Sequence, residues 1–341
     1  MANTQWSGKI AAGLGMALMT LALGSTGCST QFSITSSSGN AAQLPPLMQP
    51  LRTWQSGGGW IYAIAMSPDA RYLVSGSYDK QIKVWSLGTG QLLHTLKGHG
   101  DAVVSLAIDP QSRILASGSW DNCIYLWDLS TGKQLRMLEG HTDDVEAIAI
   151  SADGSMLVSG SADKTIRIWS VPTGKELHRF KTKDATKTVA FSPDRQTITS
   201  GTESGALEIW RIRDGALLAT FAAHTQAIRS LAFSPNGATL ASASADGTVK
   251  LWNWQTHLWQ RTLTGSGATV WSVTFSPDGK TLASSNYDKT VRLWAAATGK
   301  PLQTLGGHDA SVRSVAFSPN GDLIASGSTD STIRFWAVPR P

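Results

Sequence analysis

Short stretches of alternating apolar and polar residues run along most of the chain, and turn-forming residues separate them. The stretch at 140–170, GHTDDVEAIAISADGSMLVSGSADKTIRIWS, contains several such segments in succession. Alternation with a period of two predicts β-strands that bury one face, and the segments are too short for helices. Each stretch therefore predicts a set of successive antiparallel strands.

These stretches repeat with one period. Aligning them on the tryptophan that closes each stretch gives Trp85, Trp127, Trp169, Trp210, Trp252, Trp294 and Trp336. The spacings are 42, 42, 41, 42, 42 and 42 residues. Turns of the type Ser-Pro-Asn/Asp-Gly recur at matching places, at 234–237, 276–279 and 318–321. Seven strand-rich units at this period indicate a repeat architecture and exclude a solenoid of helices.

Four positions within each unit carry a further pattern. A Gly-His pair, a Ser before a tight turn, an Asp in that turn and the closing Trp together resemble the WD-repeat family, over residues 51–336. The resemblance implies a seven-bladed β-propeller, all-β, whose four-stranded antiparallel blades each hold these four side chains in a hydrogen-bonded tetrad. The predicted tetrads are His99, Ser117, Asp121, Trp127; His141, Ser159, Asp163, Trp169; His224, Ser242, Asp246, Trp252; and His308, Ser326, Asp330, Trp336.

Three units depart from the pattern. The first and sixth have Gly57 and Ser266 at the His position, and the fourth has Thr182 and Ser204 at the His and Asp positions. We therefore expect the fourth blade to be the least tightly held.

The two ends of the repeat array complement each other. The sequence ends five residues after Trp336, so the seventh unit lacks the strand that follows the tryptophan elsewhere. The segment Leu51-Arg52-Thr53-Trp54 aligns with Leu93-His94-Thr95-Leu96 one repeat later. We expect this N-terminal strand to complete the last blade, which would close the ring and remove an exposed sheet edge.

A His and an Asp near a Ser could also act in nucleophilic catalysis. Their recurrence in four units favours a structural role, because an active site needs only one such constellation. The chain has no Gly-rich phosphate loop, no Cys/His spacing of a metal site and no nucleophile elbow, and Cys123 is expected to be inert in a strand. We predict no catalytic residue, metal or cofactor; a propeller hydrolase or oxidoreductase using channel loops is the alternative.

Residues 1–50 differ from the repeats. A polar start with one Lys precedes an apolar run at 10–23, which is the layout of an export signal and is too short for a membrane span. Gly27-Cys28 resembles the lipobox of bacterial lipoproteins, which implies lipidation of Cys28. Residues 29–50 are uncharged and rich in Ser, Thr, Gln, Asn and Pro, which predicts a flexible tether.

The chain is thus divided into a signal peptide (1–27), a tether (28–50) and the propeller (51–341). The protein would be an extracytoplasmic, membrane-anchored bacterial lipoprotein; a cytoplasmic scaffold is the alternative. The composition, 41% hydrophobic and 16% charged, suits a globular domain. The net charge of +5 is not gathered in any Lys/Arg run, so no nucleic-acid partner is expected.

Partners of related propellers often contact one rim of the central channel. The rim positions are three and five residues after the tetrad His and one before the Asp. The partner-binding residues predicted there are Trp60, Tyr62, Tyr78, Trp120, Arg229, Trp271, Tyr287 and Arg313. Aromatic residues and Arg are typical of protein-binding hot spots, although simple packing between loops is the alternative. Asp144, Glu146 and Lys187 make the rest of the rim polar. The sequence therefore predicts a membrane-tethered, non-catalytic scaffold that binds a protein or peptide on one face.

Overall fold

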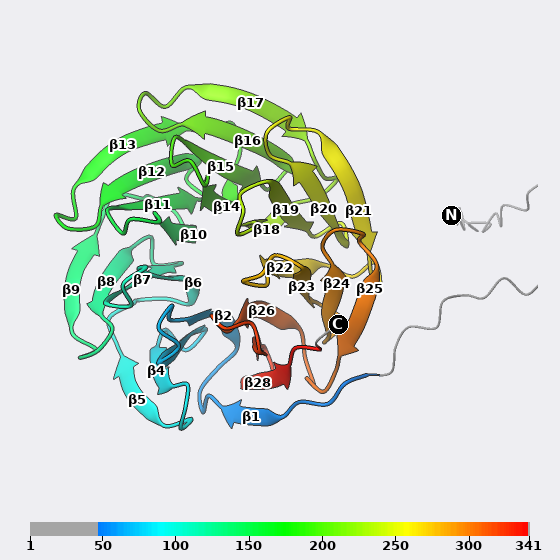
Figure 1. The fold of residues 1–341 in the computed structure, drawn as a ribbon. Coiled ribbons are helices and arrows are strands. Elements are labelled where there is room, and N and C mark those ends of the chain that lie inside the picture. Colours follow the sequence, from blue (N-terminus) through cyan, green and yellow to red (C-terminus); the bar gives the residue numbers. More distant parts are fainter. Residues whose placement is uncertain (1–46, 340–341) are drawn as a thin grey trace, which may run out of the picture. The chain divides into compact units, whose positions relative to one another are not determined.

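The structure, a computed structural model, describes residues 47–339, and the regular elements in this range are all strands. They form seven four-stranded antiparallel sheets arranged in a ring (Figure 1). One strand of each sheet borders the centre of the ring, and the fourth lies at its circumference. The predicted seven-bladed, all-β propeller is confirmed.

Each blade contains one strand of each of four kinds, ordered from the centre outward. The innermost strands are β2 (Ile61–Met66), β6 (Val103–Ile108), β10 (Val145–Ile150), β14 (Thr186–Phe191), β18 (Ile228–Phe233), β22 (Val270–Phe275) and β26 (Val312–Phe317). The second strands are β3 (Tyr72–Ser77), β7 (Ile114–Ser119), β11 (Met156–Ser161), β15 (Thr197–Thr202), β19 (Thr239–Ser244), β23 (Thr281–Asn286) and β27 (Leu323–Ser328). The third strands are β4 (Ile82–Ser86), β8 (Ile124–Asp128), β12 (Thr165–Ser170), β16 (Ala206–Arg211), β20 (Thr248–Asn253), β24 (Val291–Ala295) and β28 (Thr332–Ala337). The outermost strands are β5 (Leu92–Leu96), β9 (Gln134–Leu138), β13 (Glu176–Lys181), β17 (Leu217–Ala222), β21 (Trp259–Thr264), β25 (Pro301–Leu305) and β1 (Arg52–Gln55).

The core lies between neighbouring blades. The second strand β3 is buried along its whole length, whereas the outermost strand β9 exposes four of its five residues. Glycines allow the blades to approach closely: a Cβ on Gly327 would lie 2.6 Å from Ile61 Cγ2, and one on Gly76 would lie 2.8 Å from Val103 Cγ1. A larger side chain at either position would therefore push two blades apart.

Serines of the innermost strands also join neighbouring blades around the channel. Each hydroxyl oxygen accepts a hydrogen bond from a backbone N–H of the next blade. The three bonds are Ile64 N to Ser314 Oγ at 3.1 Å, Ile148 N to Ser105 Oγ at 3.0 Å and Val273 N to Ser230 Oγ at 3.2 Å. The first of them links the last blade to the first and so supports closure of the ring.

The N-terminal strand β1 completes the seventh blade, as predicted. It pairs antiparallel with β28, with Arg52 opposite Phe335, and lies beside it at the circumference (Figure 1). The Trp54 ring lies 4.4 Å from the Phe335 ring and 5.8 Å from the Trp85 ring. Trp54 therefore fastens the two ends of the propeller and also reaches the first blade.

The chain contacts the sixth blade before it reaches β1. Met48 N donates to Thr304 O at 3.0 Å, and Gly306 N donates to Met48 O at 3.1 Å. These bonds form a parallel bridge between Met48 and Leu305 at the end of β25. They begin upstream of Leu51, where the sequence analysis starts the propeller, so the N-terminal segment joins two blades.

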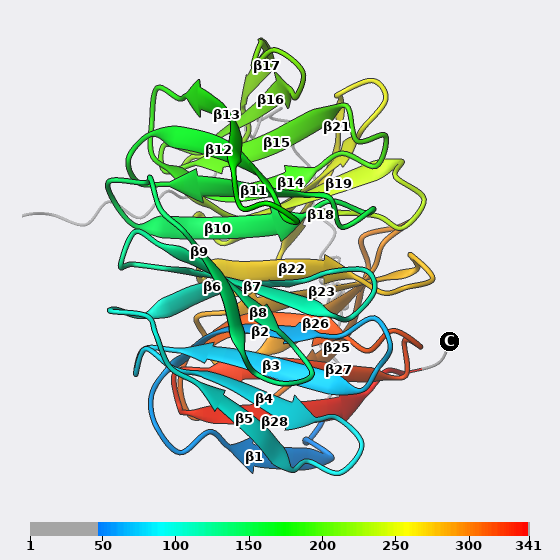
Figure 2. The same cartoon turned by 90° about the vertical axis from the view of Figure 1, so that its left-hand side faces the viewer.

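The two faces of the ring carry different turns, which project to either side in the edge view of Figure 2. We call the upper face the one that carries the turns between second and third strands, such as residues 78–81, and the loops that lead into the innermost strands. The opposite face carries the Ser-Pro-Asn/Asp-Gly turns. In one of these turns Ser234 Oγ donates to Asn236 Oδ1 at 2.7 Å, which fixes the turn locally.

Replacing Trp54 tests the closure of the ring. We expect Trp54→Ala to lower the free energy of unfolding by about 2 to 4 kcal/mol, because it removes the ring that packs on Phe335 and Trp85. Trp259→Ala is the matched control, since Trp259 lies on the outermost strand β21 and is 56% exposed. Its effect should stay within about 0.5 kcal/mol. Urea unfolding followed by circular dichroism measures both, and equal midpoints would show that β1 does not hold the ring.

Candidate functional site

The second residue of every innermost strand borders the central channel near the upper face. In all seven blades the pairing with the second strand skips this residue, which marks a β-bulge. The skipped residues are Tyr62, Val104, Glu146, Lys187, Arg229, Trp271 and Arg313. Together with Trp120 they line a cavity of about 350 Å³, which we call the channel mouth. A bulge re-aims its side chain, so the mouth is built from residues that the blade does not need for pairing.

Aromatic rings and guanidinium groups cover one part of the channel mouth. Arg313 Cζ lies 3.6 Å from the centre of the Trp271 ring and 5.1 Å from that of Tyr62. Arg229 Cζ lies 5.3 Å from the Trp271 ring, and the Tyr62 and Trp120 rings are 5.3 Å apart. Cation–π contacts contribute about 0.5 to 2 kcal/mol each, depending on desolvation, and here they hold the guanidinium groups against the rings.

Two more rings extend this part of the mouth onto the upper face. Tyr78 lies 6.3 Å from the Tyr62 ring and 5.4 Å from the Trp60 ring. Trp60 is 49% exposed and Tyr78 is 51% exposed, so neither belongs to the core of a blade. We call the whole group the aromatic–arginine cluster. It consists of Trp60, Tyr62, Tyr78, Trp120, Arg229, Trp271 and Arg313.

Ion pairs occupy the other part of the mouth. Lys187 Nζ lies 2.5 Å from Glu146 Oε1 and 3.1 Å from Glu203 Oε2. Arg229 reaches the same Glu203 only at 3.9 Å. Burial raises the pKa of Asp144, and the negative charge of Glu146 adds to that rise. The carboxylates therefore gather on blades three and four, and Lys187 neutralises part of their charge.

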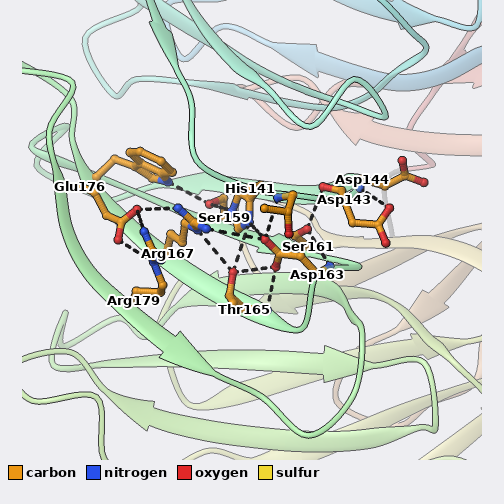
Figure 3. Close-up of polar contacts among 12 residues, drawn as sticks. His141, Asp143, Asp144, Ser159, Ser161, Asp163, Thr165, Arg167, Glu176 and Arg179 are labelled. Atoms are coloured by element: carbon orange, nitrogen blue, oxygen red, sulfur yellow. Dashed lines mark hydrogen bonds and ion pairs between the residues drawn. The ribbon is translucent and has the colours of Figure 1, made fainter.

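A buried polar chain in the third blade joins the third strand to the upper face (Figure 3). Trp169 Nε1 donates to Ser159 Oγ at 2.9 Å, and Ser159 Oγ lies 2.7 Å from His141 Nε2. His141 Nδ1 lies 2.8 Å from Asp163 Oδ2. With His141 neutral and protonated at Nδ1, every donor in this chain meets an acceptor. The chain ties the loop before β10 to the turn between β11 and β12.

Hydrogen bonding keeps the aspartate of this chain ionised. Burial by itself would raise the pKa of Asp163, but hydrogen bonds from His141 and Thr165 outweigh it and hold the pKa well below its usual range. In the fifth blade burial lowers the pKa of His224, although Asp246 opposes that shift. The lowered pKa of Asp163 favours a charged aspartate in the third blade, and the lowered pKa of His224 favours a neutral histidine in the fifth blade at neutral pH.

The same contacts recur in three other blades. The His Nδ1 to Asp Oδ2 distance is 2.8 Å for His99–Asp121, 2.9 Å for His224–Asp246 and 2.7 Å for His308–Asp330. The seventh blade differs in one respect from the predicted tetrad: Trp336 Nε1 is buried and has no acceptor among residues 47–339. Trp336 instead packs beside the His308 ring at 5.8 Å, so this blade has a chain of three side chains.

The blades without the histidine use the side chain two positions before the closing Trp. In the fourth blade Ser200 Oγ donates to Glu208 Oε2 at 3.2 Å, and Ser204 N donates to Asp184 Oδ2 at 2.7 Å. In the sixth blade Arg292 pairs with Asp288 at 2.6 Å. In the fourth blade Glu208 thus bonds to the serine that a histidine contacts elsewhere. That this blade is the least tightly held stays a prediction.

The model of the WD domain, G-beta repeat family matches seven stretches of the chain. They are residues 48–86, 90–128, 132–170, 174–211, 215–253, 259–295 and 299–337. The chain belongs to the WD-repeat family. WD-repeat propellers typically serve as scaffolds that bind protein partners, and they are generally non-catalytic. The comparison with individual curated proteins gave no match.

The WD-repeat framework brings most of the predicted rim residues together. Of the eight predicted partner-binding residues, Tyr62, Trp120, Arg229, Trp271 and Arg313 line the channel mouth. Trp60 and Tyr78 continue the cluster outward. Tyr287, in the turn after β23, is 62% exposed and makes no ring contact within the described part of the chain.

The remaining candidate positions of this WD-repeat chain divide into two groups. Cys28, the signal peptide and the tether up to residue 46 lie outside the described residues. Burial, with the charges of Asp121 and Glu139, raises the pKa of the Cys123 thiol to about 11, which makes it a poor nucleophile at neutral pH. Within residues 47–339 no group of three or more His, Cys, Asp and Glu is placed to hold a metal, and no helix has the length and apolar character to span a membrane.

Two residues with clear roles were missed by the sequence analysis. Glu208 is only 4% exposed, and it bonds to the serine that the missing histidine of the fourth blade would contact. Burial raises the pKa of Glu208. Its signal was an acid where the other WD units carry Lys, Tyr or Arg. Glu203 bridges Lys187 and Arg229 at the mouth, at the position before the missing Asp. The offset of one residue before the tetrad Asp marks this position as part of the rim. Its pairing with Lys187 and Arg229 could not be predicted, because it depends on which blades are neighbours in space.

Replacing one tetrad aspartate tests the structural role of the chain. We expect Asp163→Ala to lower the free energy of unfolding by about 1 to 3 kcal/mol, because it leaves the buried His141 without its acceptor. Ser204→Ala is the control at the equivalent place, because the backbone N–H of Ser204 that bonds to Asp184 stays in the variant. Thermal unfolding compares the two variants. Equal midpoints would contradict a stabilising tetrad in the third blade.

Proposed function

We propose that this protein is a non-catalytic interaction scaffold, anchored outside the cytoplasm through Cys28, that binds a peptide or protein segment on its upper face. The aromatic–arginine cluster supports this proposal most directly. It gathers residues of blades one, two, five, six and seven at one end of the channel. The mouth measures about 350 Å³, which suits inserted side chains rather than a folded domain.

The composition of the cluster favours a protein partner. Trp, Tyr and Arg dominate protein-binding hot spots, because they bury a large area with few rotatable bonds and still offer hydrogen-bond donors. Trp60 and Tyr78 are about half exposed, and they adjoin the more buried Tyr62. A segment that covered these rings would therefore bury apolar area without rearranging a blade. The carboxylates on blades three and four make nucleic acid an unsuitable partner.

The tetrads favour a role without catalysis. The four His–Asp pairs resemble parts of a hydrolytic site, but their His side chains are almost completely buried, with exposures of 0 or 1%. Their Ser hydroxyls are engaged by His in four blades and by Trp in three of those. A substrate could not reach these groups without unfolding the blade.

The place where the N-terminal segment meets the propeller suits a membrane tether. Met48 bonds to Thr304 at the outer edge of blade six, and β1 continues along blade seven at the circumference. The channel mouth lies at the centre of the ring. A tether that starts at the circumference leaves the mouth open to a partner.

Replacing Cys28 tests the anchor. We expect Cys28→Ser to move the protein from the membrane fraction to the soluble fraction and to abolish incorporation of labelled fatty acid, because attachment by acyl chains depends on about 0.8 kcal/mol for each buried CH₂. Cys123→Ser is the control, since Cys123 lies in the propeller, and it should keep both properties. If the Cys28→Ser protein stays membrane-bound and uncleaved, the lipoprotein assignment is wrong.

Alanine substitutions on the upper face test the binding site. For a partner captured with the intact protein from its own membranes, we expect Trp60→Ala to cost about 2 kcal/mol or more of binding free energy. Asp144→Ala should cost less than about 1 kcal/mol, as expected for a charge at the rim of an interface. The melting temperature of Trp60→Ala should stay near that of the wild type, because Trp60 lies outside the core. Normal binding by Trp60→Ala together with loss of binding by Asp144→Ala would place the partner over blades three and four instead.

A further inference from the structure

Four hydrogen-bond donors at the channel mouth are buried and have no acceptor among the described residues. They are Trp120 Nε1, Arg229 Nε, Trp271 Nε1 and Arg313 Nε. All four side chains line the same cavity. Buried donors without acceptors cost free energy unless a water or a ligand satisfies them. The side chains at the mouth therefore carry more donors than acceptors, and a ligand that supplies acceptors would complement them once a neighbouring side chain turns to uncover the donors.

The charges at the mouth also favour a ligand with acceptors, because positive charge there is not fully paired. Lys187 has two close carboxylate partners, and Arg229 has a single distant one in Glu203 at 3.9 Å. Arg313 forms no ion pair within residues 47–339. Burial lowers the pKa of Arg313, and the positive charge of Arg229 adds to that effect. A negative charge placed near these two groups would relieve both the desolvation and the repulsion.

The surroundings would strengthen a bond to such a charge. Both guanidinium groups lie near the Trp271 ring, with Arg313 Cζ 3.6 Å and Arg229 Cζ 5.3 Å from its centre. The centre of the Tyr62 ring lies 5.1 Å from Arg313 Cζ. Aromatic walls exclude water and lower the local dielectric, and they keep the guanidinium groups oriented before a ligand arrives. A charge-assisted bond from Arg to a carboxylate is about twice as strong as a neutral hydrogen bond, and the planar guanidinium can bind both carboxylate oxygens.

We propose that the channel mouth binds a single carboxylate of an acidic peptide segment, held by Arg313 and Arg229 beside Trp271 and Trp120. This inference rests on the proposed function and specifies the chemistry of the partner. The carboxylate belongs either to an Asp or Glu side chain or to the C-terminus of the segment. The rings of Trp60 and Tyr78 receive the residues next to it.

The acidic part of the mouth limits the ligand to one such group. Glu146, Glu203 and Asp144 border the site on blades three and four. A long polyanion would meet these carboxylates as soon as it extended across the channel, whereas one carboxylate on the Arg313 side would not. The arrangement therefore favours an acidic peptide over nucleic acid or an anionic membrane surface.

Selection of peptides on the full-length protein tests this inference. A random peptide display library is selected on the wild-type protein. The peptides obtained are synthesised unchanged and in three altered forms. In one form each Asp or Glu is changed to Asn or Gln, in another the C-terminus is amidated, and in the third a phosphoserine replaces the acid. We expect one of the first two changes to weaken binding at least about tenfold, which identifies the source of the carboxylate. The phosphoserine form should bind no more tightly than the original.

Variants of the protein supply the matched controls. Arg313→Gln should weaken binding of the original peptide at least about tenfold. The original and the carboxylate-free peptides should then bind this variant with nearly equal affinity, as expected when both changes remove the same charge pair. Arg313→Lys should restore part of the affinity, because the charge returns without the planar fork. Arg213→Gln, in an exposed turn of the opposite face, should bind like the wild type, and melting temperatures show whether each variant is folded.

The outcomes separate this inference from the proposed function. Loss of binding in Trp60→Ala, with no effect of removing carboxylates, would place peptides on the upper face and overturn the carboxylate assignment alone. If the peptides bind to Trp60→Ala and to Arg313→Gln as tightly as to the wild-type protein, both the carboxylate assignment and the proposed binding on the upper face are overturned. Tighter binding of the phosphoserine form, or a selection that yields no peptide above background, would also overturn the carboxylate assignment.

Discussion

The buried bond between histidine and aspartate in a blade fixes both elements that the blade presents on the upper face. His141 lies in the loop that leads into β10, and Asp163 lies in the turn between β11 and β12, so their 2.8 Å contact joins loop and turn. Glu146 follows His141 by five positions, and in the second blade Trp120 directly precedes the tetrad Asp121. Because an unpaired buried polar group is costly, the loop and turn have little freedom to move apart. In the four blades that have this bond, the side chains at the channel mouth are therefore held in place by bonds that lie inside the blade.

Closure of the ring makes these local bonds act together. A single four-stranded blade exposes both of its faces, and it becomes stable only between two neighbours. Strand β1 and Trp54 supply the last outer strand, Met48 reaches blade six, and Ser314 bonds to Ile64 near the channel. The ends of the chain are thus joined at the circumference and at the centre. A channel mouth built from seven separate strands can keep its geometry because the ring has no open seam in the described residues.

Structural positions repeat along the chain, whereas channel-mouth positions vary. The serine that accepts the Trp N–H or its equivalent is present in all seven units, at Ser75, Ser117, Ser159, Ser200, Ser242, Ser284 and Ser326. The bulged residues of the innermost strands are instead Tyr, Val, Glu, Lys, Arg, Trp and Arg. A bulge frees its side chain from blade packing, so the fold does not dictate the residue type there. The variation produces an aromatic and cationic part beside an acidic part, which is what a selective binding site requires.

The sequence by itself determined the number of blades, their four-stranded pattern, the closing strand and the tetrad positions, because each of these follows from a local pattern repeated seven times. It also pointed to the rim residues, since their offsets from the tetrad are constant. Only the tertiary structure decided which of these residues meet. Arg313 lies against Trp271 and Tyr62, although 42 and 251 positions separate them in the chain, because the ring places blade seven between blades six and one. The same holds for Glu208, whose replacement of a histidine depends on two strands pairing in register, and for Trp336, whose N–H lacks the acceptor that its sequence position predicts. Such contacts join residues that are distant in sequence or alter a single blade, so a repeated local pattern carries no information about them.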